Sequence, residues 1–308
     1  MEKCKHFFKM CKRFIFDKKI RFSYFNKMGF FNGWSDEKFL KKQYNVIYGK
    51  KLNLENPIAL IDKLQWLKIH DRKPEYVKMV DKYAVKDIIR EVLGDQYVIP
   101  TLGVWHNPDD IPFGQLQGNY VLKPTHASGS NIICREDEQI QVKKIKRKLK
   151  KSLKTNYFYH AREWPYKDVR PAIIAEPLLV MDDGTAIIDY KFYCYGGRPI
   201  YFMYSLGEAN HTVRNHKFDM NLQSIDYLFK EKPTVDISDI VLPANIDEMI
   251  KIVEKLCKGY KHIRIDLYNV NGRIYFGEFT FFSGGGYLNI KSEKFSNYLA
   301  DLITIEDV

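Results

Sequence analysis

The stretch RIDLYNVNGRIYFGEFTFFSGGGY, residues 264–287, indicates how the chain folds around two of its acids. Two runs of alternating side chains flank the dipeptide Asn271-Gly272, which is a strong signal for a tight β-hairpin turn. Asp266 and Glu278 lie inside these runs. Symmetric pairing about the turn puts Asp266 opposite Gly277, one position from Glu278. The two acids are therefore expected to lie close together on adjacent strands.

Two carboxylates at this separation repel each other, and their pKa values separate, unless a cation lies between them. Mg²⁺ suits hard oxygen ligands and shares the oxygens of a substrate phosphate. An ion pair of either acid with Arg264, Arg273 or a nearby lysine is the alternative, and the hairpin alone favours it. The glycine-rich run 283–286 raises a second question, whether it is a phosphate-binding loop.

The composition is that of a folded globular protein with a preference for anionic partners. The chain has 308 residues, 45% hydrophobic and 15% aromatic, which excludes a disordered chain. Its formal net charge of +11 favours nucleotides, nucleic acid, acidic polysaccharide or an anionic membrane. The five cysteines have no CxxC spacing, which argues against zinc and disulfides and indicates a reducing, cytoplasmic setting. No apolar run has transmembrane length, and the N-terminus does not resemble a secretory signal.

Residues 1–34 form a basic segment of their own. Phe7, Met10, Cys11 and Phe14 recur at helical spacing, with lysines and arginines among them. Two placements fit such an amphipathic helix. It packs on the body of the protein with a solvated basic face, or it makes peripheral contact with an anionic membrane.

Residues 35–95 are expected to be helical, and residues 96–308 to alternate strands and helices, which together predict an α+β fold. The expected elements are helices opening at Ser35 and at Asn56-Pro57, a helix over 81–93 ended by Gly94, strands from about residue 97, a basic helix over 142–154, a hairpin turning at Gly196-Gly197, a helix over 245–258 and a closing helix over 291–303. The basic helix could bind nucleic acid, but its apolar stripe favours a solvated helix face.

Charged side chains stand beside small-residue loops or inside strands at three further places. Lys123 precedes the loop Ala127-Ser128-Gly129-Ser130, whose backbone N–H groups suit phosphate oxygens, although a plain turn is the alternative. Asp189 and Lys191 share one strand face, where they suit a ribose and a phosphate, although a cross-strand or solvated ion pair is the alternative. Glu176 ends an apolar strand, as a hinge residue or a strand-end charge. The loop is not a Walker A motif, and GxSxG, HExxH and a Rossmann GxGxxG are absent from the sequence.

Five segments, in order, resemble the TupA-like ATP-grasp family, which is associated with teichuronopeptide and capsular polysaccharide biosynthesis. The resemblance covers about residues 40–290 and implies an ATP-grasp fold that binds its nucleotide between two α+β subdomains, with a hinge near residues 175–181. The segments are DKLQWLKIHDRKPEYVKMVDKYAVKDII, YVLKPTHASGS, REWPYKDVRPAIIAEPLL, DYKFYCYGGRP and IRIDLYNVNGRIYFGEFTFFSGGGY.

The resemblance also implies roles for single residues. Lys82 and Lys123 would hold the ATP phosphates under a lid formed by Ser128, Gly129 and Ser130, Glu176 and Leu179 would read the adenine, and Asp189 and Lys191 would lie on the ribose or phosphate side. Asp266, Glu278 and Thr280 would bind Mg²⁺, and Arg264, Arg214 and Lys191 would bind the acceptor or stabilise developing negative charge.

Three positions depart from the family pattern. Thr280 replaces a common Asn, which leaves the number of Mg²⁺ ions open. Pro177 follows Glu176 and removes one backbone donor from the hinge. Ala127 stands where glycine is expected.

The implied activity is that of a Mg-ATP-dependent carboxylate–amine ligase. ATP would phosphorylate a carboxylate, and an amine would attack the acyl phosphate, joining an amino acid or amine to a uronic acid or related group of a surface polysaccharide. Alternatives are a sugar kinase on the same fold, a glycosyltransferase of a polysaccharide locus, and a non-catalytic membrane or nucleic-acid binder. No nucleic-acid partner is expected. The expected location is cytoplasmic, with peripheral contact at the inner membrane face as an option, and the run 283–286 then faces the second substrate.

Overall fold

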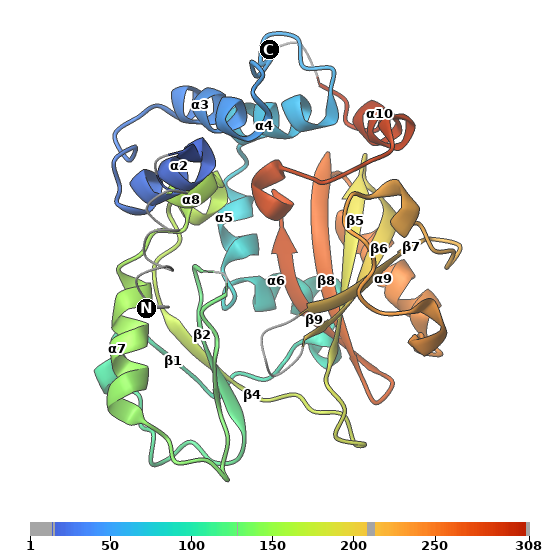
Figure 1. Cartoon of the computed structure of the whole chain (residues 1–308). Coiled ribbons are helices and arrows are strands. Elements are labelled where there is room, and N and C mark those ends of the chain that lie inside the picture. The colour runs from blue at the N-terminus through green and yellow to red at the C-terminus, as the bar shows by residue number, and fades with distance from the viewer. Residues whose placement is uncertain (1–13, 15, 128, 208–212, 306–308) are drawn as a thin grey trace, which may run out of the picture.

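The computed structural model describes residues 14, 16–127, 129–207 and 213–305. These residues form two antiparallel sheets with helices around them, in agreement with the predicted α+β class (Figure 1). Nowhere within these ranges is a helix both long enough and apolar enough to cross a bilayer. The expected helix around Phe7, Met10 and Cys11 lies outside the described residues.

The smaller sheet has the strand order β1-β4-β2-β3. Its strands are β1 (Gly103–Trp105), β2 (Tyr120–Pro124), β3 (Ile132–Cys134) and β4 (Ile173–Pro177). The basic helix α7 (Val142–Leu153) covers one face, and its Ile145 and Leu149 are buried against Leu122 and Ile173. The lysines of α7 thus flank an apolar stripe that packs on the sheet, which agrees with the solvated-face interpretation. The first strand is shorter than expected: it begins at Gly103, and residues 95–97 form a 3₁₀ turn.

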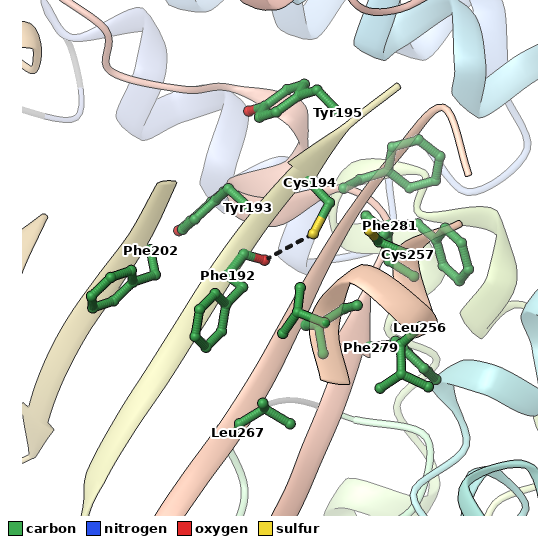
Figure 2. Packing of buried hydrophobic residues seen from close by; sticks show 14 of the residues in the cluster. Phe192, Tyr193, Cys194, Tyr195, Phe202, Leu256, Cys257, Leu267, Phe279 and Phe281 are labelled. Carbon is green, nitrogen blue, oxygen red and sulfur yellow. Dashed lines mark hydrogen bonds between the residues drawn. The ribbon is translucent and has the colours of Figure 1, made fainter. Parts of the chain in front are cut away.

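The larger sheet has the strand order β7-β6-β5-β8-β9. Its strands are β5 (Ile188–Tyr195), β6 (Arg198–Gly207), β7 (Val213–Asp219), β8 (His262–Val270) and β9 (Arg273–Thr280). Helix α9 (Ile246–Cys257) packs on one face, where Figure 2 shows Leu256 and Cys257 near Phe192, Leu267 and Phe279. The aromatic-rich core on this face makes the sheet a rigid support for the charged side chains on its other face.

Both predicted hairpin turns are present. Asn271 and Gly272 have φ values of 54° and 80°, and Gly196 and Gly197 have φ values of 58° and 74°. Positive φ at both central residues matches the twist of the flanking strands.

A bulge shifts the register of the β8–β9 hairpin. Leu267 pairs with Phe276, but Asp266 pairs with Glu278, so Gly277 is the extra residue. The expected pairing of Asp266 with Gly277 is therefore wrong by one position. Glycine inside a strand is a common sign of a bulge. The bulge places the two acids directly opposite each other.

The N-terminal helices differ from expectation at their starts. Helix α3 (Asp36–Tyr48) begins at the predicted cap, where Ser35 Oγ accepts from Lys38 N at 3.3 Å. Helix α4 (Leu60–His70) begins three residues after the predicted Pro57. The predicted helix 81–93 begins only at Val85, because Asp81 Oδ1 accepts from Tyr83 N at 2.8 Å and caps the turn before it.

Helix α2 (Lys18–Lys27) belongs to the predicted basic segment and packs on α3. Its Phe22 is buried with Phe31, Phe39 and Leu40 in a separate apolar cluster. The remaining elements are α5 (Glu75–Val80), α6 (Val85–Val92), α8 (Phe158–Ala161), α10 (Glu293–Asp301) and the 3₁₀ turns Asp95–Tyr97, Pro108–Asp110, Trp164–Tyr166, Asp226–Leu228, Ile237–Asp239 and Ser283–Gly286. The division of the chain at residues 34 and 95, with a hinge near 175–181, stays a prediction; that hinge segment leaves β4 for the larger sheet.

Candidate active site

Arg264 holds the two acids of the β8–β9 hairpin together. Its Nε lies 2.6 Å from Oδ1 of Asp266, and its Nη2 lies 2.7 Å from both Oδ2 of Asp266 and Oε1 of Glu278. Its Nη1 donates to Oγ of Ser283 at 3.0 Å. The bulge allows this arrangement, because it aligns the two carboxylates on one face of the sheet. The ion pair that the sequence left as an alternative is thus present in the structure.

Lys191 is a second cation at this place. Strand β5 pairs with β8 so that Lys191 lies opposite Asp266, with Nζ 3.0 Å from Oδ2. Lys191 also pairs with Asp189, two residues earlier on the same strand face. Burial raises the pKa of Asp189 to about 7, and the charge of Asp266 adds to this effect while Lys191 opposes it.

Lys82 connects this cluster to the smaller sheet. It precedes α6, and its Nζ donates to the carbonyl of Ala127 at 3.0 Å and lies 3.4 Å from Oε2 of Glu278. Burial alone would raise the pKa of Glu278, but Lys82, Arg264 and Lys191 outweigh it and lower the pKa to about 2. Glu278 therefore carries a full negative charge at neutral pH, between three cations.

Glu176 at the end of β4 joins two more lysines. Its Oε1 lies 2.5 Å from Nζ of Lys86, and its Oε2 lies 2.6 Å from Nζ of Lys123. Lys86 also donates to the carbonyl of Ile99 at 2.6 Å. Burial opposes ionisation of Glu176, yet the two lysines keep its pKa below the ordinary value. Glu176, the predicted hinge acid, therefore neutralises Lys123, which was predicted to bind phosphate.

These groups surround a narrow cavity of about 50 Å³ between the two sheets, which we call the lysine-lined cavity. Its polar lining is Lys82, Lys86, Lys123, Asn131, Glu176, Tyr268 and Glu278. Three lysines around one space suit an anionic group such as a polyphosphate. Pockets for small molecules usually measure about 300–1,000 Å³, so a nucleotide can enter only if the cavity widens.

A second cavity of about 570 Å³ lies on the other side of Glu278, and we call it the N-terminal cavity. Helices α2 and α3, the α8 region and the end of β9 enclose it. Its polar lining includes Ser23, Asn26, Gln43, Glu163, Arg264 and Glu278. Glu278 lines both cavities, so one carboxylate separates a lysine-rich space from a larger space that can hold a second molecule.

The glycine run 283–286 is anchored by helix α4. Lys68 Nζ donates to the carbonyls of Gly285 and Ala161 at 2.5 and 2.8 Å, and Gln65 Nε2 donates to the carbonyl of Gly286 at 3.1 Å. A Cβ on Gly286 would lie 2.7 Å from that Gln65 nitrogen, and its φ is +74°, so this position requires glycine. Gly284 and Gly285 line the N-terminal cavity, which agrees with the interpretation of this run as a second-substrate contact rather than a phosphate loop.

The acid pair fits a Mg²⁺ ion that is shared with a phosphate. Within the described ranges, no three His, Cys, Asp or Glu side chains are grouped to hold a metal by themselves. Mg²⁺ commonly takes one or two carboxylates and completes its shell with water and phosphate oxygens. Oε2 of Glu278 receives one 3.4 Å hydrogen bond from Lys82, whereas Arg264 would have to turn to free Asp266. Thr280 Oγ1 donates to Oε1 of Glu278 at 3.3 Å and orients that carboxylate.

Most predicted site residues come together around these two cavities: Lys82, Lys123, Glu176, Asp189, Lys191, Arg264, Asp266, Glu278 and Thr280. Gly129 is exposed in the loop after β2 with a φ of +71°, and Ser130 hydrogen-bonds Ser152 at 3.4 Å. Ser128 lies outside the described residues. Leu179 follows β4 and is not among the residues that line either cavity.

Arg214 is not brought to the other predicted residues. It lies on β7, and β6 and β5 separate β7 from β8. Arg214 on β7 pairs with Leu206 on β6, and Lys191 on β5 pairs with Met203 on the same strand β6. Leu206 and Met203 are an odd number of residues apart. Neighbouring positions of a strand point to opposite faces, so Arg214 lies on the face opposite to Lys191. Its predicted role at the acceptor has no support from this geometry.

Three buried charged residues near the site were not predicted: Lys86, Lys68 and Glu163. Lys86 follows Lys82 by four residues in the sequence. In the expected helix 81–93 this spacing places both lysines on one face, so the sequence could have indicated Lys86 as a site residue. Lys68 and Glu163 become site residues only through tertiary packing, because α4 and the segment before β4 are distant in sequence from β9.

A scan against protein families matches the family described as TupA-like ATPgrasp over residues 62–304, well over half of the chain. The protein is therefore an ATP-dependent ligase of the ATP-grasp class. Within that class the chain belongs to the TupA-like ATP-grasp family. A search of curated proteins finds no match.

Solved structures with a similar course of the chain include several ATP-grasp ligases. D-alanine–D-alanine ligase from Helicobacter pylori is 15% identical with a TM-score of 0.41, over 79% of this chain and 68% of that chain. D-cycloserine synthetase DcsG is 14% identical with a TM-score of 0.39, over 74% and 70%. The ATP-grasp ligase PsnB, solved with minimal precursor, Mg and ADP, is 14% identical with a TM-score of 0.38, over 79% and 64%.

Proposed function

We propose that this ligase joins a carboxylate to an amine through an acyl phosphate and uses Mg-ATP. The observation that carries the proposal is the position of Glu278 in the wall between the lysine-lined cavity and the N-terminal cavity. A phosphoryl donor on one side and a carboxylate acceptor on the other would meet at this residue. The charges suit such a meeting, because Lys82, Arg264 and Lys191 surround the acid pair.

In the first step the γ-phosphoryl group of ATP moves to a carboxylate oxygen, and ADP leaves. Such a transfer needs alignment and charge stabilisation more than a nucleophilic side chain. Lys82, Lys86 and Lys123 would hold the phosphates, after Glu176 has released its two lysines. Glu278 and Asp266 would hold Mg²⁺, which supplies neutralisation of the phosphate oxygens when bound.

In the second step an amine nitrogen attacks the acyl carbon, and inorganic phosphate leaves. Negative charge then develops on the acyl oxygen. Arg264 lines the N-terminal cavity, so its guanidinium would serve as a donor for that oxygen once it has released Asp266 to the metal.

The proposed substrates are an amino acid or amine and a uronic acid or related group in capsular or other surface polysaccharide synthesis. The support is the association of the TupA-like family with such polysaccharides, together with the net charge of +11, which favours acidic sugars. A sugar kinase on the same fold would give a phosphoester in place of an amide. A glycosyltransferase would leave ATP unconsumed.

The proposed location is cytoplasmic, with peripheral contact at the inner membrane face. Support comes from the buried free thiols Cys134, Cys194 and Cys257, which suit a reducing compartment. Support for membrane contact comes from α2 and the turn after it, where Met28 and Phe30 are 68% and 69% exposed beside basic residues.

The decisive experiment is an ATP-consumption screen against amino acids and uronic-acid sugars, followed by mass spectrometry of the products. We expect an amide product, ADP and phosphate from the wild-type protein, and a loss of turnover of at least 100-fold in Glu278→Gln. Glu75→Gln, which changes an exposed acid on α5, is the matched control. A phosphoester product, or full turnover by Glu278→Gln, would refute the proposed function.

A further inference from the structure

The N-terminal cavity contains polar atoms that lack partners. Glu163 is only 4% exposed and lines this cavity. Across the described ranges, its carboxylate receives no hydrogen bond and forms no ion pair within 4.0 Å. A buried carboxylate is costly unless a cation or several donors compensate it. Lys68 and Arg264 act on this charge only through space, so the carboxylate still has room for a donor that carries positive charge.

Asn26 on α2 lines the same cavity and carries an acceptor atom without a hydrogen-bond partner. Its Nδ2 donates to the carbonyl of His160 at 2.9 Å, which fixes the orientation of the amide, because a carbonyl only accepts. Its Oδ1 is consequently the free end, and this atom is buried without a hydrogen-bond partner. Two residues that line this cavity thus carry side-chain acceptors without a hydrogen bond.

The cations near Glu163 are engaged elsewhere. Lys68 Nζ donates its three N–H groups to Oε1 of Gln65 and to the carbonyls of Ala161 and Gly285. Arg264 donates to Asp266, Glu278 and Ser283. Lys19 also lines the cavity, but its side chain belongs to the exposed surface of α2.

We propose that the N-terminal cavity binds the amine-bearing substrate as a primary ammonium compound, with its ammonium group on Glu163 and Asn26. An ammonium group supplies three donors and one positive charge, which matches these acceptors. The inference rests on the proposed ligase function and deepens it by naming the chemistry of the second substrate and the residues that select it.

The location of Glu163 also suits the reaction itself. Arg264 and Glu278 line the same cavity, so a bound amine lies on the side of the acid pair where the acyl carbon would be presented. The ammonium must lose one proton before it attacks, and Glu163 can accept it. As the C–N bond forms and the C–O bond to phosphate breaks, the second proton of the nitrogen leaves with the departing phosphate. Burial raises the pKa of Glu163 to about 7, although Lys68 and Arg264 oppose this, so the group holds a proton more readily than an ordinary glutamate.

A binding experiment without ATP tests this inference independently of the ligase activity. Glycinamide serves as the ammonium probe and propionamide as its uncharged analogue of similar size, with binding followed by ligand-observed NMR titration. We expect wild type to bind glycinamide at least about 10-fold more tightly than propionamide, because the charged hydrogen bond is buried. We expect this preference to disappear in Glu163→Gln and to persist in Glu75→Gln. Equal binding of both probes to wild type, or an unchanged preference in Glu163→Gln, overturns the inference.

A second measurement separates failure of this inference from failure of the proposed function. With Mg-ATP and a uronic-acid sugar, hydroxylamine traps an acyl phosphate as a hydroxamate, and it reacts as a neutral nucleophile at pH 7. We expect KM for the amine to rise at least about 10-fold in Glu163→Gln, while Glu75→Gln keeps both the hydroxamate formation and the KM of wild type. No hydroxamate from wild type contradicts the ligase function, whereas an unchanged KM in Glu163→Gln contradicts only the role of Glu163.

Discussion

At the scale of single residues, Arg264 shows how one side chain serves two purposes. It is fully surrounded by acceptors, and these acceptors are the same acids that we propose as metal ligands. Together with Lys191 and Lys82, Arg264 compensates the charge of these acids. On the proposed function a divalent cation would take the place of the guanidinium at Asp266, so Arg264 would have to release that carboxylate.

His262, two residues before Arg264, is expected to make stability depend on pH. Its Nδ1 donates to the carbonyl of Cys194 at 3.0 Å, which leaves Nε2 buried without a partner. Burial lowers the pKa of His262 from 6.5 to about 4. Between these two values the unfolded chain binds a proton that the folded chain does not, so the free energy of unfolding falls as the pH falls.

We expect the protonation of His262 in the unfolded chain to lower the free energy of unfolding by about 1 kcal/mol as the pH falls from 6.5 to 5.5. Urea denaturation at pH 7.5, 6.5 and 5.5 measures the change. The variant His262→Gln keeps a donor and does not titrate, so its pH dependence over this range should be weaker by the same amount. Identical slopes for the variant and wild type would show that His262 does not carry this dependence.

At the scale of elements, the bulge in β9 decides the geometry of the site. A Cβ on Gly277 would lie 2.9 Å from the carbonyl oxygen of Asp266 and 3.1 Å from Cε2 of Tyr268. Any side chain at this position must therefore push the two strands apart. A shift of one residue in pairing would also turn one of the two acids to the opposite face.

We expect Gly277→Ala to lower the free energy of unfolding by about 1–3 kcal/mol and to reduce ATP turnover at least about 10-fold. Gly272→Ala in the hairpin turn is the matched control. Its φ of +80° makes it costly by about 1 kcal/mol, but a Cβ there contacts nothing within 4 Å. Thermal denaturation and turnover are measured on both variants. If turnover falls equally in both, loss of stability and not the bulge explains the effect.

Much of this element-scale description could be predicted from the sequence. Asn271-Gly272 and Gly196-Gly197 mark their turns by residue type alone, and the strand faces of Asp189, Lys191 and Asp266 follow from alternation. The exact pairing of Asp266 could not be derived, because symmetric counting from the turn ignores a bulge. Glu163 and Lys68 could not be predicted as site residues, because both are buried only through tertiary packing, which no local sequence pattern expresses.

At the scale of the whole molecule, α2 has two faces with different surroundings. Lys19, Phe22, Ser23 and Asn26 share the face that lines the N-terminal cavity. Tyr24, Phe25 and Met28 lie on the opposite face and are 51%, 39% and 68% exposed. Exposed aromatic and apolar side chains beside lysines are typical of helices that lie on anionic membranes.

We expect the protein to cosediment with vesicles of phosphatidylglycerol and phosphatidylcholine, and to be released by 0.5 M salt, since part of the attraction is electrostatic. The triple variant Phe25→Ser, Met28→Ser, Phe30→Ser should bind at least about 5-fold more weakly. The double variant Ile237→Ser, Val241→Ser removes exposed apolar side chains elsewhere and should bind like wild type. Equal loss in both variants, or binding to purely zwitterionic vesicles, would argue against this orientation.

The residues that line the N-terminal cavity come from two parts of the chain, and this has a consequence for how such a ligase could change its substrate. The match to the family begins at residue 62, yet Lys19, Phe22, Ser23, Asn26 and Gln43 line the space next to Arg264 and Glu278. On the proposed mechanism, activation of the carboxylate would use residues within 62–304, while residues before this range would help to shape the space for the incoming molecule. Exchange of the residues before position 62 alone could redirect such a ligase to a new second substrate and leave the ATP-dependent first step intact.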